Sequence, residues 1–149
     1  MKLSDSVNAF VRLSITFLVF LSLFIATEHL SAEIHPKYYA EKQSEADEFL
    51  EIQVDLVKRR FSFSIRKTPL RVTATVVAVH RSENGLHIGD EITIEYEHFR
   101  PNRDWVGPRP IPILYRNHVY PAFLNWSDTE QVYIPAARGA SFEPEIQLD

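Results

Sequence analysis

Four histidines lie in the part of the chain that is expected to fold, and they are the first candidates for metal or acid–base chemistry. His80 and His98 stand at predicted strand ends, and His87 and His118 stand at predicted turns. None of them forms the HxH or HExxH spacing that places two ligands on one strand or one helix face. The sequence therefore predicts no metal site, no cofactor and no catalytic residue.

One enzymatic hypothesis nevertheless stays open. His80, His98 and His118 could serve a small hydrolase or a metal-dependent enzyme if at least two of them met a nearby acidic side chain in one pocket. The chain contains no cysteine, which excludes thiolate metal sites and cysteine nucleophiles. Its four glycines provide no glycine-rich phosphate loop.

A second group of side chains has the composition of a binding surface. Residues 100–112 contain four prolines and a glycine without any periodicity, which predicts a long extended loop. Loops of this length inside a compact domain are often functional, and arginine with large aromatic side chains is typical of interface anchors. The candidate ligand-binding residues are Arg103, Trp105, Arg109, Tyr115, Arg116 and Trp126, with Arg100 and Tyr120 beside them. The competing interpretation is that Trp105 plugs one end of the fold and Tyr120 belongs to the core.

Two long strands are predicted to position these side chains. Apolar residues recur at every second position in residues 70–78, which is the period of a half-buried strand, and Ile88, Ile92, Ile94 and Tyr96 form a similar row. A three-residue loop with Gly85 in the left-handed conformation would pair Val76 with Ile92 and bring both apolar rows to one face. Further short strands are predicted at 50–56, 61–65, 113–115, 119–124 and 131–134.

Residues 1–32 have the features of a secretory signal peptide. Basic residues flank a polar start, residues 13–26 are apolar, and Ala32 offers a small side chain for cleavage. The apolar run is shorter than the roughly 20 residues that span a bilayer. A secreted or periplasmic location is therefore predicted, and the alternative is a membrane anchor formed by residues 13–26.

The remaining chain is expected to form one domain. An N-terminal arm or short irregular helix (33–48) would lead into a barrel domain (49–142), and an acidic tail (143–149) would fray. Five or six short strands with corner and bulge signals favour an all-β fold, a small antiparallel OB-like barrel. The net charge of −4 shows no nucleic-acid footprint.

Three groups of residues recur with the spacing of a known family. They are Val72, Ala74 and Val76; then Gly85, Leu86, Gly89, Asp90 and Ile92; then Asn117, Tyr120, Phe123 and Leu124. This pattern resembles the OB-type barrel of the netrin-like and metalloproteinase-tissue-inhibitor class. The resemblance implies the fold of that class. It does not imply inhibition, because those inhibitors present an N-terminal cysteine to a catalytic zinc and this chain has no cysteine.

These observations predict an exported, non-enzymatic binding module. OB barrels bind oligonucleotides or sugars on one face, but export and the acidic balance of the chain argue against nucleic acid. The expected partner is a protein or a glycan. A membrane is expected as a partner only if the N-terminal apolar segment stays uncleaved.

Overall fold

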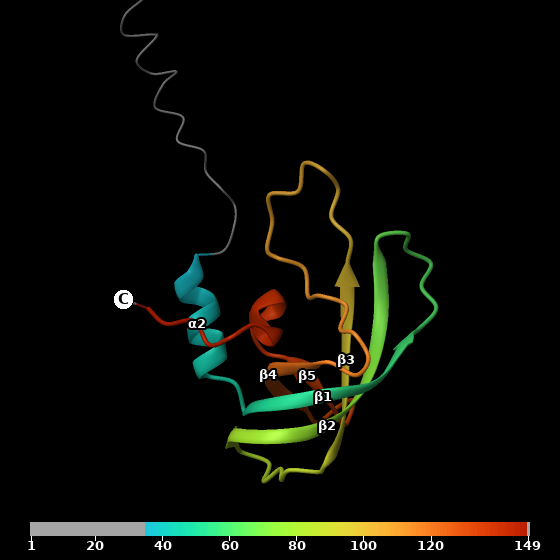
Figure 1. Ribbon diagram of the computed structural model, residues 1–149. Helices are drawn as coiled ribbons and strands as arrows, with labels where there is room; N and C mark the ends of the chain where they lie inside the picture. Colours follow the sequence, from blue (N-terminus) through green and yellow to red (C-terminus); the bar gives the residue numbers. More distant parts are fainter. Residues whose placement is uncertain (1–34, 149) are drawn as a thin grey trace, which may run out of the picture. The chain divides into compact units, whose positions relative to one another are not determined.

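Five strands close into a barrel in the computed structural model, which describes residues 35–148. The strands are β1 (Glu48–Arg59), β2 (Lys67–Ser82), β3 (Glu91–Phe99), β4 (Val119–Ser127) and β5 (Val132–Pro135). Around the barrel their order is β1-β2-β3-β5-β4 (Figure 1). The predicted all-β, OB-like small barrel is confirmed. It is not wholly antiparallel, because β3 and β5 pair in parallel where Ile94 meets Tyr133.

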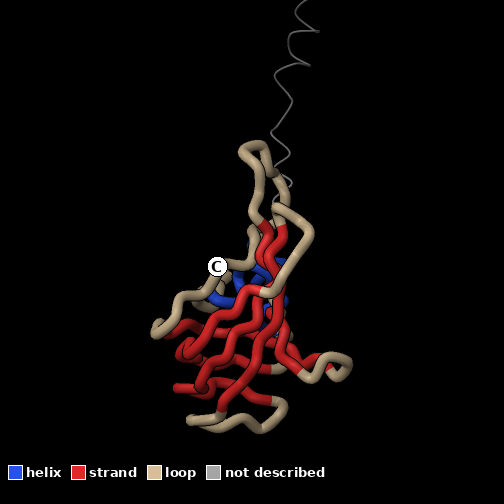
Figure 2. Tube along the Cα trace, turned by 90° about the vertical axis from the view of Figure 1, so that its right-hand side faces the viewer, coloured by secondary structure: helices blue, strands red, loops and turns tan. Residues whose placement is uncertain are grey.

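The predicted apolar rows form the barrel core. Val72, Ala74 and Val76 on β2, and Ile92 and Ile94 on β3, are at most 3% exposed. Since successive side chains of a strand point to opposite faces, the polar residues between them lie outside. In Figure 2, the strands form the body of the barrel, long loops extend from them, and the few helical residues lie behind the strands.

The predicted register between β2 and β3 is wrong by two residues. Ala74 pairs with Ile92 and Val72 pairs with Ile94. The predicted tight turn does not form, because β2 continues to Ser82 along β1 and residues 83–90 make the connection. Gly85 has the predicted positive φ, +71°. An offset of two residues keeps every side chain on its face, so the core survives the error.

Residues 61–65 do not form the predicted strand. They lie in the loop between β1 and β2, and Ser62 and Ser64 accept backbone hydrogen bonds from the residues two positions later, at 3.1 and 3.3 Å. Such bonds favour turns over a strand ladder. In β1 the register shifts between Val54 and Leu56, and Leu56 therefore turns outward, although alternation predicted it inside.

Residues 113–115 are also outside any strand, although Leu114 is buried. The turn after them is attached to β1 rather than forming a hairpin. Asn117 N–H donates to the Val54 carbonyl at 2.7 Å, and Val54 N–H donates to the His118 carbonyl at 3.0 Å. Asn117 accommodates the turn with a φ of 64°, a conformation that asparagine adopts more readily than most residues.

The N-terminal arm contains a regular helix, α2 (Pro36–Ser44), whose first turn has the favourable proline. Tyr39 and Gln43 lie one turn apart on its buried face, beside the short helix η1 (Arg138–Phe142). Gln43 donates to the Ala140 carbonyl at 2.8 Å and accepts from Ile146 N–H at 2.8 Å. Gln43 thus contacts the acidic tail at Pro144 and Ile146, and the fraying of this tail stays a prediction.

The predicted signal peptide (1–32), its cleavage near Ala32 and the alternative anchor (13–26) all lie outside the described residues. Between residues 35 and 148, no helix combines the length and the apolar character that crossing a bilayer requires.

Candidate functional site

The long connection between β3 and β4 forms one wall of a groove of about 390 Å³, here called the loop groove. Its apolar walls are Phe99, Trp105, Pro108, Pro110 and Ile111. Its charged rim is Lys67, Glu97, Arg109 and Arg138. Binding pockets commonly combine mostly apolar walls with a few polar groups that orient the ligand, and the loop groove has this composition.

Two side chains of β3 hold the second half of the long loop against the barrel. The Tyr96 hydroxyl donates to the Pro112 carbonyl at 2.8 Å. His98 Nδ1 lies 2.7 Å from the Ile111 carbonyl, and because a carbonyl only accepts, this nitrogen carries the proton. Burial raises the pKa of Tyr96 to about 12, so its hydroxyl remains a donor at neutral pH. The floor of the loop groove is therefore fixed to a strand.

Trp105 forms the outer wall of the loop groove. Its indole N–H donates to the Pro108 carbonyl at 3.1 Å, and its ring centroid lies 4.7 Å from that of Phe99. Gly107 leaves room for the indole, because a Cβ there would come within 2.3 Å of the ring. The side chain remains 43% exposed. Trp105 therefore does not plug an end of the barrel, and it presents a positioned aromatic surface instead.

Arg109 is held by the N-terminal and C-terminal segments of the domain. Its Nη1 lies 3.1 and 3.0 Å from the two carboxyl oxygens of Glu143. Its guanidinium carbon lies 5.4 Å from the ring centroid of Tyr39, within the range of a cation–π interaction. These contacts fix the direction of the cation at the rim of the groove.

The helix η1 closes the groove from the far side. Arg138 has a φ of 51°, a conformation that costs free energy outside glycine and asparagine. Next to it, a Cβ on Gly139 would lie 2.9 Å from the Pro110 carbonyl oxygen. Only glycine lets η1 approach the loop this closely, so residues 30 positions apart in the sequence share one site.

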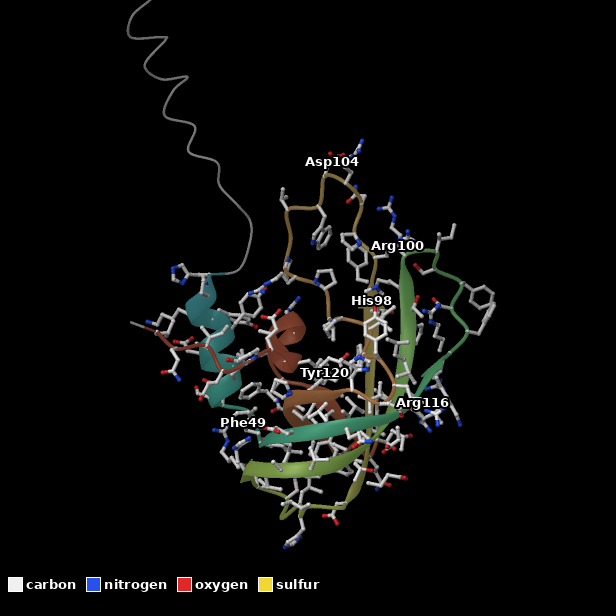
Figure 3. The ribbon with its side chains drawn as sticks, in the orientation of Figure 1. Phe49, His98, Arg100, Asp104, Arg116 and Tyr120 are labelled. Carbon is white, nitrogen blue, oxygen red and sulfur yellow. The ribbon has the colours of Figure 1, made fainter. Side chains whose placement is uncertain are left out.

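The six candidate binding residues do not form one surface. Trp105 and Arg109 line the loop groove, whereas Arg103 is exposed near the tip of the loop. Tyr115 and Arg116 belong to the turn before β4, and Figure 3 places Arg116 well below Arg100 and Asp104. Trp126 lies on the second half of β4, where its ring contacts Tyr133 at 5.0 Å.

The two neighbours of the predicted set have separate roles. Tyr120 is half-buried and packs against the core, as the competing interpretation expected. Its hydroxyl accepts the backbone N–H of Tyr115 at 3.1 Å. The backbone N–H of Arg100 donates to the Arg66 carbonyl at 2.8 Å, which joins the long loop to the β1–β2 loop.

Four groove residues outside the proline-rich loop were missed by sequence reasoning, namely Lys67, Glu97, Phe99 and Arg138. Phe99 stands directly before the proline-rich loop and Lys67 is its partner across β2 and β3, so a correct register would have pointed to both. Arg138 could not have been found in this way. Nothing in the sequence brings η1 to the loop, since the approach depends on packing around Gly139.

The three histidines of the enzymatic hypothesis lie on separate parts of the barrel. His80 stands near the end of β2 and its Nε2 lies 3.3 Å from Glu51 Oε1. His98 contacts the Ile111 carbonyl, and His118 Nδ1 contacts the Arg116 carbonyl at 3.0 Å. Within residues 35–148, no group of three or more histidine or acidic side chains could hold a metal ion. The convergence that the hypothesis requires is not found among these three histidines.

Comparisons with protein-family models, with curated proteins and with solved structures find no match to this chain. The loop groove is therefore interpreted from its own geometry.

Proposed function

We propose that the protein is an exported, non-enzymatic binding module that holds an extended, acidic segment of a protein partner in the loop groove. The observation that carries this proposal is Trp105, a large aromatic side chain that is positioned by a hydrogen bond yet 43% exposed. Tryptophan and arginine beside apolar walls are the usual anchors of protein recognition.

The rigidity of the groove supports binding. Tyr96 and His98 hold the loop at Pro112 and Ile111, and Trp105 is fixed against Pro108. A surface that is already ordered loses less conformational entropy when a partner binds, and more of the contact free energy therefore appears as affinity.

The charges of the rim favour an acidic ligand. Lys67 and Arg109 already pair with Glu97 and Glu143. Arg138 lines the groove and has no acidic partner among the described residues. A carboxylate of the ligand would complete this pairing through a charge-assisted hydrogen bond.

A glycan is the second candidate, because the exposed face of Trp105 also offers a stacking surface for a sugar ring. The enzymatic alternative is less well supported, since His80, His98 and His118 have separate contacts. The resemblance to netrin-like barrels and the predicted export stay predictions.

The test is affinity capture from the extracytoplasmic fraction of the native organism, followed by direct binding to the purified partner. The full chain is compared with Trp105→Ala and with Tyr115→Ala, a matched control that removes an exposed aromatic side chain outside the groove. We expect Trp105→Ala to lose the partner and Tyr115→Ala to keep it. Equal capture by wild type and Trp105→Ala would contradict the proposal, and binding to a glycan array alone would favour the second candidate.

A further inference from the structure

The loop between β1 and β2, residues 60–66, exposes three large apolar side chains that nothing in the described chain covers. Phe61, Phe63 and Ile65 are 82%, 96% and 99% exposed. The two rings contact each other edge to face at 5.0 Å. Figure 1 shows this loop on the side of the barrel away from α2. Contiguous exposed apolar groups of this kind usually mark an interaction site.

The loop is built to hold this arrangement. Its base is closed by Arg60 N–H donating to the Pro69 carbonyl and by Arg100 N–H donating to the Arg66 carbonyl, both at 2.8 Å. Inside it, the hydroxyls of Ser62 and Ser64 accept backbone N–H groups. The alternating serines therefore satisfy the backbone locally, and the apolar side chains between them remain outside.

A collar of positive charge surrounds these apolar side chains. Residues 58–67 contain five lysine or arginine residues and no acidic residue, in a chain whose net charge is −4. Arg60 lies 3.3 Å from Glu95, and Lys67 lies 2.8 Å from Glu97. Arg71 also pairs with Glu95, so this carboxylate is shared.

The remaining cations of the collar are not neutralised by the protein. Lys58, Arg59 and Arg66 are exposed, and none has an acidic partner among residues 35–148. On the neighbouring loop, Arg100 and Arg103 add positive charge, and Asp104 is the acidic residue beside them. The positive field is thus concentrated at the base of the apolar tip.

We infer that residues 60–66 are a membrane-docking loop for an anionic phospholipid bilayer. Phe61, Phe63 and Ile65 would enter the boundary between headgroups and acyl chains, to a depth of about 5–10 Å, while the basic collar would bind the headgroups. The apolar tip of the loop matches the acyl-chain region of a bilayer, and the basic residues at its base match the anionic headgroup region. Protein interfaces instead place their anchors near the centre of a broad, rimmed contact surface, and this short loop provides no such surface.

The inference is independent of the proposed function of the loop groove and of the predicted N-terminal segment. The bond between Arg66 and Arg100 does place the two loops side by side. Docking would therefore hold the loop groove near the membrane surface.

The absence of cysteine permits a test in the full chain that reports on the loop alone. Ser64→Cys carries an environment-sensitive fluorophore at the tip, and Glu83→Cys carries it on an exposed residue beyond the other end of β2. Because Ser64→Cys loses the hydroxyl that accepts Arg66 N–H, co-sedimentation of the unlabelled wild type and of its Phe61→Ser, Phe63→Ser, Ile65→Ser variant with the same vesicles is measured beside it. Each protein is mixed with vesicles of phosphatidylcholine and phosphatidylglycerol, or of phosphatidylcholine alone. We expect a blue shift, and quenching by lipid-borne quenchers, for Ser64→Cys with the anionic vesicles. Glu83→Cys should show neither, even if residues 13–26 attach the chain to the vesicle.

Two sets of variants separate the apolar and the electrostatic contributions. Phe61→Ser, Phe63→Ser and Ile65→Ser together should abolish the spectral response at Ser64→Cys. Lys58→Gln, Arg59→Gln and Arg66→Gln together should weaken the anionic-vesicle response roughly a hundredfold at low salt. Circular dichroism confirms that each variant keeps its strands.

The inference is overturned if the label at Ser64→Cys shows the same emission with anionic vesicles as in buffer. An equal response with neutral vesicles would remove the role of the basic collar. A response to a soluble protein fraction, without any response to vesicles, would assign the loop to a protein partner instead.

Discussion

Glu48 Oε1 accepts two hydrogen bonds from Asn84, one from its backbone N–H at 3.0 Å and one from its side-chain amide at 2.8 Å. Glu48 is fully buried at the start of β1, whereas Asn84 lies in the connection between β2 and β3. The other carboxyl oxygen, Oε2, is buried and has no hydrogen-bond partner among the described residues. One side chain thus fastens the connecting segment to the barrel.

Replacing Glu48 should destabilise the fold more than replacing Asn84. Glu48→Ala leaves a cavity and removes both bonds that hold Asn84 to the barrel, and we expect a loss of about 2–3 kcal/mol in the free energy of unfolding. Asn84→Ala keeps the backbone donor, and we expect a loss of about 1 kcal/mol. Urea unfolding of both single variants and the double variant gives their coupling. Additive losses would show that the two residues act separately.

Gly139 should be required for the loop groove. In Gly139→Ala the new Cβ would lie 2.9 Å from the Pro110 carbonyl oxygen and 3.0 Å from the Arg109 Cβ. Because the backbone of η1 or of the loop must move, we expect the free energy of unfolding, measured by thermal denaturation, to fall by about 1–3 kcal/mol. An unchanged free energy of unfolding would contradict the prediction, because it would mean that η1 can move away from the loop without cost.

Gly107→Ala tests the position of the Trp105 indole rather than the backbone. The new Cβ would overlap the ring at 2.3 Å, and a partly exposed side chain can turn away. We therefore expect a red-shifted tryptophan emission with a stability loss below about 1 kcal/mol. The Trp126→Phe variant leaves Trp105 as the remaining tryptophan. Adding Gly107→Ala to this variant should produce the same red shift in its emission.

Alkaline pH should destabilise the protein through its buried tyrosines. Burial raises the pKa of Tyr96 to about 12 from its ordinary value of 10.0, and burial raises the pKa of Tyr133 likewise to about 12. Between these two pH values the unfolded phenol loses its proton and the folded one keeps it. The free energy of unfolding is therefore unaffected by these groups below pH 10 and falls as the pH rises towards 12, by about 2 kcal/mol for Tyr96.

Denaturant unfolding of wild type, Tyr96→Phe and Tyr115→Phe across this range measures the effect. Tyr96→Phe should reduce the fall in the free energy of unfolding at alkaline pH. At neutral pH the same variant should lose about 1 kcal/mol of this free energy, because it lacks the hydrogen bond to Pro112. Tyr115 is 66% exposed, so Tyr115→Phe should follow wild type. Identical pH profiles for all three proteins would contradict the prediction.

Gln43→Ala should release the C-terminal segment. Gln43 is fully buried, and its amide pairs with the backbones of Ala140, Pro144 and Ile146. Its removal leaves buried polar groups unpaired, and we expect the free energy of unfolding to fall by about 2 kcal/mol. Limited proteolysis should then cut residues 143–148 faster than in wild type. Glu41→Ala, on the exposed side of the same helix, is the control and should be cut at the wild-type rate.

Much of the barrel follows from local alternation, whereas the binding site does not. The alternating apolar residues of β2 up to Val76 and of β3 from Ile92 lie in the barrel core, as alternation predicts, because the period of a strand is a local property. Of the six candidate binding residues, Trp105 and Arg109 reach the loop groove. The others share their composition but not their position, since residue type alone carries no information on which segments meet.

By itself, the sequence determined that the chain builds a small β-barrel around alternating apolar residues and carries a long proline-rich loop. The tertiary structure alone decided the register. The last residues of β2 pair with β1 instead of turning back onto β3, and Ala74 therefore pairs with Ile92. It also decided that Phe61, Phe63 and Ile65 alternate like a buried strand yet lie in solvent. Alternation says which side chains share a face, and only the presence of another packed surface decides whether that face is covered.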